Sequence, residues 1–138
     1  MPVAAAASST SSFFAKVNSI TESELDSLPH GVIQLDAEGN VLRYNAFEVG
    51  LSGLAKKKAL GKNFFKQVAP FTDRRDFCGR VRDGIAAGAL HCTFRFYFAF
   101  EPNPRDAAVT LFFNHRDQTT WILVQPFEGT TEQIWGRR

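Results

Sequence analysis

The chain has 138 residues, of which 44% are hydrophobic and 22% are charged, and its formal net charge is +2. This length fits a single domain with its own core, and the small charge, with no basic run interleaved with aromatics, gives no support for nucleic-acid binding. No stretch approaches the roughly 20 apolar residues of a membrane-spanning helix, and the N-terminus lacks the basic start and apolar run of a secretory signal. We therefore expect a cytoplasmic globular protein that makes no membrane contact.

The first predicted elements form an N-terminal cap. Residues 1–12 are rich in Ala and Ser and are expected to be a disordered tail. Residues 13–28 carry apolar side chains at helical spacing: Phe13, Phe14, Val17, Ile20, Leu25 and Leu28. The "TESE" sequence that starts at Thr21 is a capping-box pattern, which predicts a second short helix running through the last two of these. The segment is amphipathic and needs an apolar surface to cover.

A β-hairpin is predicted in "GVIQLDAEGNVLRYN", where two short β-rich runs flank the turn residues 36–40. Residues 45–73 are then expected to form short helices, interrupted at Gly50, Gly53, Gly61 and Pro70. The sequence "DRRDFCGRVRDGIAAGA" predicts a longer helix with three apolar residues on one stripe and a glycine stop: Phe77, Val81, Ile85 and Gly88.

Three more strands are predicted in the last third of the chain. In "LHCTFRFYFAF", residues 90–100, every second side chain is apolar and faces one side. "EPNPRD" is predicted to be a loop, and strands follow in residues 107–116 and 119–127, with apolar side chains on both faces. Such a sheet needs a cover on each side. We therefore predict an α+β fold, in which residues 29–126 form a five-stranded antiparallel sheet with short helices on one face and the N-terminal cap on the other. Residues 127–138 are expected to form a C-terminal tail.

Four stretches of the sequence resemble a known family. They are "ELDSLPHGVIQLDAEGNVLRYNAFE", "GKNFFKQVAPFTD", "GIAAGAL" and "WILV", and they follow one another within residues 24–125. Together they resemble the photoactive yellow protein family, whose domains have the PAS fold. The resemblance implies a sensory or signalling module, because this family consists of bacterial blue-light receptors that carry p-coumaric acid as a thioester on one cysteine.

The resemblance also implies a candidate ligand pocket. It sets Tyr44 and Glu48 where the family's tyrosine and protonated glutamic acid hydrogen-bond the chromophore, and Ser52 where a threonine supports that tyrosine. The other matches to pocket-lining positions are Phe64, Val68, Ala69, Thr72, Phe96, Phe98 and Phe100. Three positions depart from the family: Leu54 replaces an arginine, Phe100 replaces a tyrosine, and Phe71 stands where the chromophore-bearing cysteine is expected.

A phenyl ring has no nucleophile, so no thioester can form at Phe71. Cys78 and Cys92 are expected to be structural, and the sequence shows no haem, flavin or metal-binding pattern. We therefore expect no covalent cofactor, no metal and no enzyme activity.

Two hypotheses about function stay open. In the first, Tyr44 and Glu48 reversibly hold a small, mostly apolar ligand. In the second, phenylalanine rings fill the pocket, and the domain acts only by binding a signalling partner protein or a second copy of itself. A small enzyme that uses Tyr44 and Glu48 for proton transfer is a further alternative.

Overall fold

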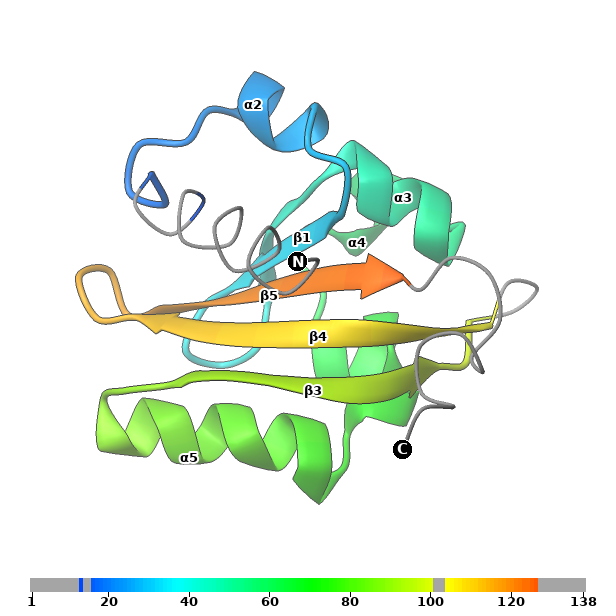
Figure 1. Cartoon of the computed structure of the whole chain (residues 1–138). Coiled ribbons are helices and arrows are strands. Elements are labelled where there is room, and N and C mark those ends of the chain that lie inside the picture. Colours follow the sequence, from blue (N-terminus) through cyan, green and yellow to red (C-terminus); the bar gives the residue numbers. More distant parts are fainter. Residues whose placement is uncertain (1–12, 14–15, 101–103, 127–138) are drawn as a thin grey trace, which may run out of the picture.

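A five-stranded antiparallel sheet forms the centre of the computed structural model, which describes residue 13 and residues 16–100 and 104–126 (Figure 1). The strand order across the sheet is β2-β1-β5-β4-β3. The strands are β1 (Gly31–Leu35), β2 (Val41–Tyr44), β3 (His91–Phe98), β4 (Arg105–Asn114) and β5 (Thr119–Pro126). All helices between β2 and β3 are short, and the arrangement confirms the predicted α+β fold.

The hairpin between β1 and β2 is closed by a turn that Asp36 organises. Its Oδ1 atom accepts hydrogen bonds from the backbone N–H groups of Glu38 and Asn40 at 2.9 and 2.8 Å. Gly39 has a positive φ of 91°, which glycine adopts without strain. Both features confirm the predicted hairpin. Its first strand lies between β2 and β5, and all five of its residues are buried.

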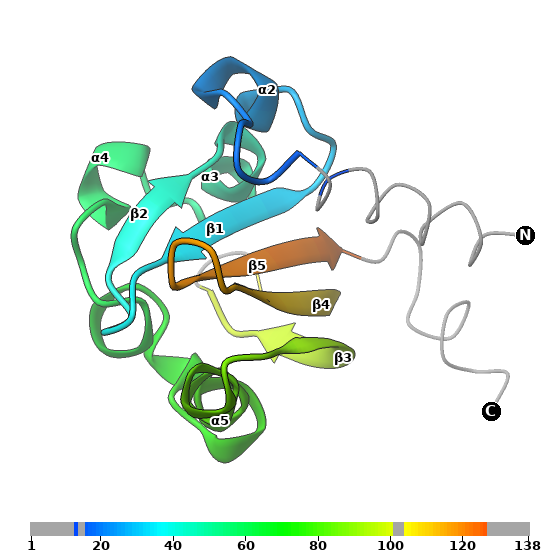
Figure 2. The ribbon, with the colours of Figure 1, turned by 90° about the vertical axis from the view of Figure 1, so that its left-hand side faces the viewer.

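The helices between β2 and β3 cover one face of the sheet (Figure 2). They are α3 (Ala46–Ser52), α4 (Lys56–Ala59), the π-helical turn η1 (Phe64–Val68), the 3-10 turn η2 (Pro70–Thr72), the π-helical turn η3 (Arg75–Gly79) and α5 (Arg80–Ala87). Gly88 ends α5 in the left-handed conformation, as predicted. The predicted break at Gly50 was wrong, because α3 runs from a side-chain cap at Asn45 to a left-handed Gly53, and Gly50 lies inside it.

Both faces of β5 and of most of β4 are buried, as the apolar pattern of these two strands predicted. The face opposite the helices carries Val32, Trp121 and Leu123, which pack against the N-terminal cap. Among the described residues, the buried apolar side chains of the cap are Phe13, Val17, Ile20 and Leu25. Ring contacts strengthen this packing, because Phe13 meets Trp121 edge to face at a centroid distance of 5.4 Å.

The helix α2 (Glu22–Asp26) lies in the cap, and the predicted capping box is present at its start. Thr21 accepts a hydrogen bond from the backbone N–H of Glu24, and the Glu24 carboxylate accepts one from the backbone N–H of Thr21. The helix ends at Asp26 and does not run through Leu28 as predicted, because the next residue already caps it. Leu28 is half-buried against the same apolar cluster.

Ion pairs connect α2 to α4. The Nζ atom of Lys56 on α4 lies 2.8 Å from Glu22 and 3.0 Å from Asp26. Arg43 on β2 donates a hydrogen bond to the backbone carbonyl of Ile20 at 3.0 Å. The ion-pair groups are partly exposed, so each pair contributes at most about 1 kcal/mol. Most of the stability of the docked cap therefore comes from its apolar contacts.

The boundary between β3 and β4 differs from the prediction. β3 ends at Phe98, so Phe100 lies beyond the regular strand. β4 begins at Arg105, inside the predicted loop, because Arg105 and Asp106 pair with Phe98 and Tyr97 across the hairpin.

Several predictions concern residues outside those described. These are the tails 1–12 and 127–138, the cap residue Phe14 and part of the loop before β4. Within the described ranges, no helix is both long and apolar enough to cross a membrane.

Candidate ligand-binding site

The structure gathers the residues of the candidate pocket between α3, the turns η1 and η2, and β3. Tyr44 ends β2, and the next helix carries Glu48 and Ser52. The apolar residues of the set belong to one hydrophobic core cluster or pack against it: Phe64, Val68, Ala69, Phe71, Phe96, Phe98 and Phe100. Thr72 is also buried, and its hydroxyl donates to the Ala69 carbonyl at 2.6 Å. The chain therefore brings the candidate residues into one region.

Tyr44 is fully buried, and its hydroxyl donates a hydrogen bond to the Ser52 Oγ atom at 2.6 Å. The same Oγ atom accepts a hydrogen bond from the backbone N–H of Leu54 at 3.1 Å. Burial raises the pKa of Tyr44 above its ordinary value, and the nearby Glu48 raises it further. The phenol is therefore neutral at physiological pH, and its proton is already engaged by Ser52.

Glu48 on α3 carries a buried carboxyl group. Only 1% of the residue is exposed, and its Oε1 atom has no hydrogen-bond partner among the described residues. Burial raises the pKa of Glu48 from 4.5 to about 8, because an apolar surrounding disfavours the charged form. At neutral pH most molecules therefore hold a neutral carboxylic acid, which has one hydrogen to donate.

Gly31, the first residue of β1, has no side chain and so leaves room for the carboxyl group of Glu48. A Cβ atom at position 31 would overlap the Glu48 Oε1 atom and would also crowd Val124. The backbone of β1, an interior strand of the sheet, therefore forms one wall of the carboxyl site. Sequence patterns did not single out this glycine, because its neighbour is distant along the chain.

Asn45 is the main site residue that the sequence analysis missed. Its Oδ1 atom accepts hydrogen bonds from the backbone N–H groups of Val32 and Glu48 at 2.9 and 3.1 Å. Its Nδ2 group donates to the carbonyls of Leu25 and His30 at 2.7 and 3.0 Å. This one amide joins the cap, β1 and the helix that carries Glu48. The available signal was its N-cap position three residues before Glu48 in "YNAFE".

Phenylalanine rings pack along the β3 side of the site. The Phe71 ring on η2 lies 4.9 Å from the Phe100 ring and 6.0 Å from the Phe98 ring, centroid to centroid, in edge-to-face contacts. Phe77, which was predicted only as a core residue, lies 5.0 Å from Phe96 and 6.1 Å from Phe98. Such contacts add to the stability gained from burial.

The site offers hydrogen-bonding groups and apolar contacts but no metal-binding cluster. No group of three or more His, Cys, Asp and Glu residues that could hold a metal occurs in the part of the chain that the structure describes. Four surface clefts of the described residues are lined by neither Tyr44 nor Glu48. Chemically, the site can hold a proton on Glu48 and pack apolar atoms against the rings.

No family model matches the sequence. The photoactive yellow protein of Halochromatium salexigens is 40% identical over 106 residues, which cover 77% of this chain and 85% of that protein. The chain belongs to the photoactive yellow protein family. The resemblance drawn from the sequence is thus confirmed.

Solved structures agree with this assignment. The photoactive yellow protein domain of the sensor histidine kinase Ppr from Rhodospirillum centenum is 35% identical and superposes with a TM-score of 0.76, covering 80% of this chain and 97% of that one. A more distant match is the PAS domain of the quorum-sensing receptor RpfR from Cronobacter turicensis, solved in complex with BDSF. It is 15% identical, with a TM-score of 0.57 over 73% of this chain and 96% of that one, and it shows the fold alone. This member of the photoactive yellow protein family is a sensory module with the PAS fold.

Proposed function

We propose that this domain is a non-enzymatic sensory module that acts without a covalently attached p-coumaroyl chromophore. The observation that carries the proposal is the phenyl ring of Phe71, at the position where the family resemblance implies the chromophore-bearing cysteine. The ring packs against Phe98 and Phe100. Thioester formation needs a thiolate, and a phenyl group supplies none.

The two cysteines of the chain are poor substitutes for that thiol. Cys78 is buried in η3, and burial raises the pKa of its thiol, which reduces the thiolate fraction at neutral pH. Cys92 lies at the start of β3 and is half-buried. Neither belongs to the candidate pocket.

The output of such a module is contact with a partner protein or with a second copy of the domain. The cap supports this proposal, because Asn45 connects it directly to the helix that carries Glu48. A change in the charge or position of Glu48 would therefore alter the hydrogen bond that Asn45 donates to the Leu25 carbonyl in the cap. The related domain of Ppr belongs to a sensor histidine kinase, and we infer a signalling partner for this chain as well.

Reversible binding of a small, mostly apolar molecule beside Tyr44 and Glu48 is a second candidate. It is favoured by the buried Oε1 atom of Glu48, which lacks a partner in the described part of the chain. An unpaired buried polar atom costs about 1–3 kcal/mol, and a ligand hydroxyl or carbonyl would remove that cost. The RpfR domain, solved in complex with BDSF, supports the idea that a PAS fold can hold a bound ligand.

Treatment of the folded protein with an activated p-coumaroyl donor tests the proposal. We expect no added mass and no visible absorption band for the natural sequence. A stable adduct on Cys78 or Cys92 that gives a yellow protein would overturn the proposal.

The variant Phe71→Cys separates the two candidates, and Phe71→Ala is its control because it removes the same ring without adding a thiol. Both variants lose stability, by up to about 3–5 kcal/mol for a fully buried ring and less for the half-buried Phe71. If Phe98 and Phe100 close over the vacated space, the new thiol reacts only after unfolding. Stoichiometric labelling of folded Phe71→Cys, with none in Phe71→Ala, would instead favour an open pocket and reversible ligand binding.

A further inference from the structure

Helix α4 and the residues that follow it carry lysines with no acidic residue near them in the sequence. The stretch 49–72 contains no Asp or Glu, and its lysines are Lys56, Lys57, Lys58, Lys62 and Lys66. Lys57, Lys58 and Lys62 are exposed, and they form no ion pair in the part of the chain that the structure describes. Three positive charges therefore face the solvent close together in the chain.

Two exposed leucines lie beside these lysines. Leu42 on the edge strand β2 is 45% exposed, and Leu60, which follows α4, is 38% exposed. The N–H of Gly61 donates to the Val41 carbonyl at 2.8 Å, and the N–H of Val41 donates to the Lys62 carbonyl at 2.9 Å. This antiparallel pairing sets Leu42 opposite Leu60, and Figure 2 shows α4 beside β2. The lysines therefore adjoin an apolar spot, which a polar solvent covers poorly.

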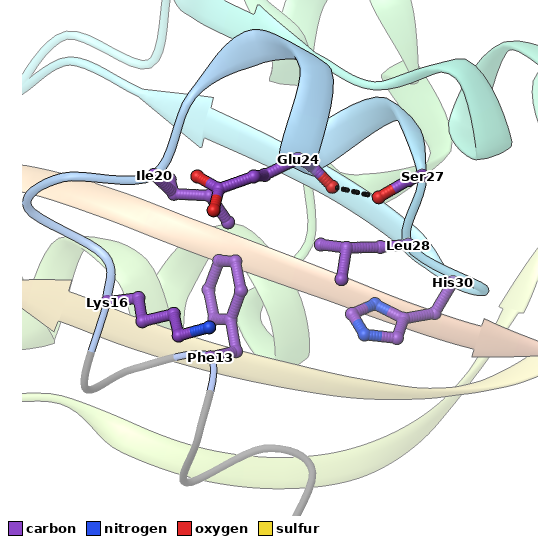
Figure 3. A pocket seen from close by; sticks show the side chains of 7 residues that line it. All are labelled: Phe13, Lys16, Ile20, Glu24, Ser27, Leu28 and His30. Carbon is purple, nitrogen blue, oxygen red and sulfur yellow. Dashed lines mark hydrogen bonds between the residues drawn. The ribbon is translucent and has the colours of Figure 1, made fainter.

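Helix α2 shows what kind of segment binds next to this place. Its Glu22 and Asp26 reach the Lys56 ammonium group at 2.8 and 3.0 Å. The third acidic residue, Glu24, lies on the same side of the cap as Ile20 and Leu28 (Figure 3), and its carboxylate accepts the hydrogen bond that closes the capping box. A short acidic helix thus already pairs with the first lysine of α4 and leaves the next two open.

We propose that Lys57, Lys58 and Lys62, together with Leu42 and Leu60, form a docking surface for an acidic amphipathic segment of a partner protein. The inference rests on the proposed function, in which the domain acts on a signalling partner. Carboxylates of the segment pair with the ammonium groups, and its apolar side chains cover the two leucines. Exposed ion pairs contribute little one at a time, so the apolar contact is needed for stable binding.

An anionic membrane fits this surface less well than a protein does. Peripheral membrane binding needs an amphipathic helix or a lipid chain that inserts apolar groups between the lipids. Here the apolar part consists of two leucines on backbone segments that are paired with each other. Such a surface is suited to contact with a folded or folding protein segment.

Binding of the partner would also be linked to the cap. While the cap is docked, Glu22 and Asp26 hold the Lys56 ammonium group. When the cap separates, Lys56 becomes available to the carboxylates of the partner. A partner that binds the open form more tightly shifts the equilibrium toward that form. Opening of the cap would therefore enlarge the docking surface.

Titration of the full chain with a synthetic peptide of glutamate and leucine, whose leucines are spaced three or four residues apart to form one helix face, tests the proposal. In two matched peptides, glutamine replaces every glutamate or alanine replaces every leucine. We expect saturable NMR shifts centred on the amides of α4, Leu42 and Leu60, and at least a several-fold weaker affinity for each matched peptide. Shifts centred elsewhere, or no saturable shift, would overturn the proposal.

Two double variants test the assigned lysines. Lys57→Glu with Lys58→Glu should weaken binding of the acidic peptide about tenfold, which corresponds to about 1.4 kcal/mol. Arg75→Glu with Arg82→Glu is the matched control, because it changes the net charge equally at exposed positions of η3 and α5. The control should lose far less affinity. Equal losses would indicate attraction to the overall charge and would contradict a defined surface.

The link to the cap has its own test. Glu22→Gln with Asp26→Asn removes the charges that hold Lys56, so the acidic peptide should bind several-fold more tightly to this variant. Unchanged or weaker binding would contradict the link.

Vesicles of phosphatidylglycerol and phosphatidylcholine test the alternative occupant. Cosedimentation that is lost in the variant with Lys57→Glu and Lys58→Glu, without binding of the acidic peptide, would replace the partner protein by an anionic membrane. Failure of the docking surface would leave the chromophore-free sensory module standing, because treatment with the p-coumaroyl donor tests that module separately.

Discussion

Replacing Glu48 by Gln should remove most of a pH dependence in the stability of the fold. The glutamine keeps the shape of the neutral carboxylic acid but cannot ionise. In the natural protein, burial raises the pKa of Glu48 from 4.5 to about 8. One pKa unit corresponds to about 1.4 kcal/mol, so a shift of this size is worth about 5 kcal/mol at most. That is a large part of the stability of an ordinary domain.

The direction follows from which state holds the proton. Between pH 4.5 and 8 the unfolded chain has released the Glu48 proton, whereas the folded protein still retains it. Unfolding therefore releases a proton, and the free energy of unfolding falls as the pH rises through this window. Above pH 8 the folded protein also ionises, and the full loss has been reached. Glu48→Gln has no such proton, so its contribution stays constant.

Urea denaturation at pH 5, 7 and 9 measures the effect. The difference in unfolding free energy between the natural protein and Glu48→Gln should change by several kcal/mol from pH 5 to pH 9, in the direction that favours the variant at high pH. Groups that Glu48 does not affect, including His30, contribute alike in both proteins and cancel in the difference, and Tyr44, whose pKa burial and Glu48 both raise, titrates above this pH range. Glu38→Gln, an exposed change in the hairpin turn, is the matched control and should give a flat difference. Parallel curves for the natural protein and Glu48→Gln would refute a neutral buried carboxyl.

Three further changes test how the site is built. Gly31→Ala should lower the free energy of unfolding by about 2 kcal/mol or more, because the new methyl group overlaps Glu48. This loss should shrink in a double variant that combines Gly31→Ala with Glu48→Ala, and additive losses would contradict the overlap. Asn45→Ala removes four hydrogen bonds and should lower the free energy of unfolding by at least about 3 kcal/mol, with faster amide hydrogen exchange in α2. Unchanged exchange in α2 would show that Asn45 does not hold the cap. Deletion of residues 1–28 exposes the apolar face of Trp121, and it should lower the free energy of unfolding by several kcal/mol, at about 25 cal/mol per Å², or cause association. Urea denaturation and size-exclusion chromatography measure these effects, and a truncated monomer as stable as the full chain would exclude the cap as a stabilising element.

Local patterns predicted those parts of the fold that depend on neighbours in sequence. The alternation in β3 follows from the two-residue period of a strand, and the turn at Asp36 follows from side-chain bonds to the next few amides. The predicted break at Gly50 was wrong because, although glycine is a poor helix former, the caps at Asn45 and Gly53 are sufficient to fix α3 around it.

Tertiary contacts decided the features that sequence patterns missed. Gly31 and Glu48 meet only when β1 and α3 pack together, so neither residue reveals the overlap by itself. Arg105 joins β4 because it has a partner in β3, although its neighbours in "EPNPRD" favour a loop. Asn45 was visible as a helix cap, but its bonds to Leu25 and His30 depend on the docked cap.

The position of β5 between β1 and β4 also has a consequence for how the chain folds during synthesis. The interior strand β1 is made early, but its partner β5 is the last of the described strands, and Gly31 pairs with Val124 near the end of β5. Until β5 leaves the ribosome, the β1–β2 hairpin has an open edge and cannot complete the layer that buries Glu48. Strand pairing over so long a separation is slow, and unpaired edges expose nascent chains to aggregation. The buried carboxyl is therefore assembled last, and substitutions in β5 that touch no site residue should still lower the yield of folded protein.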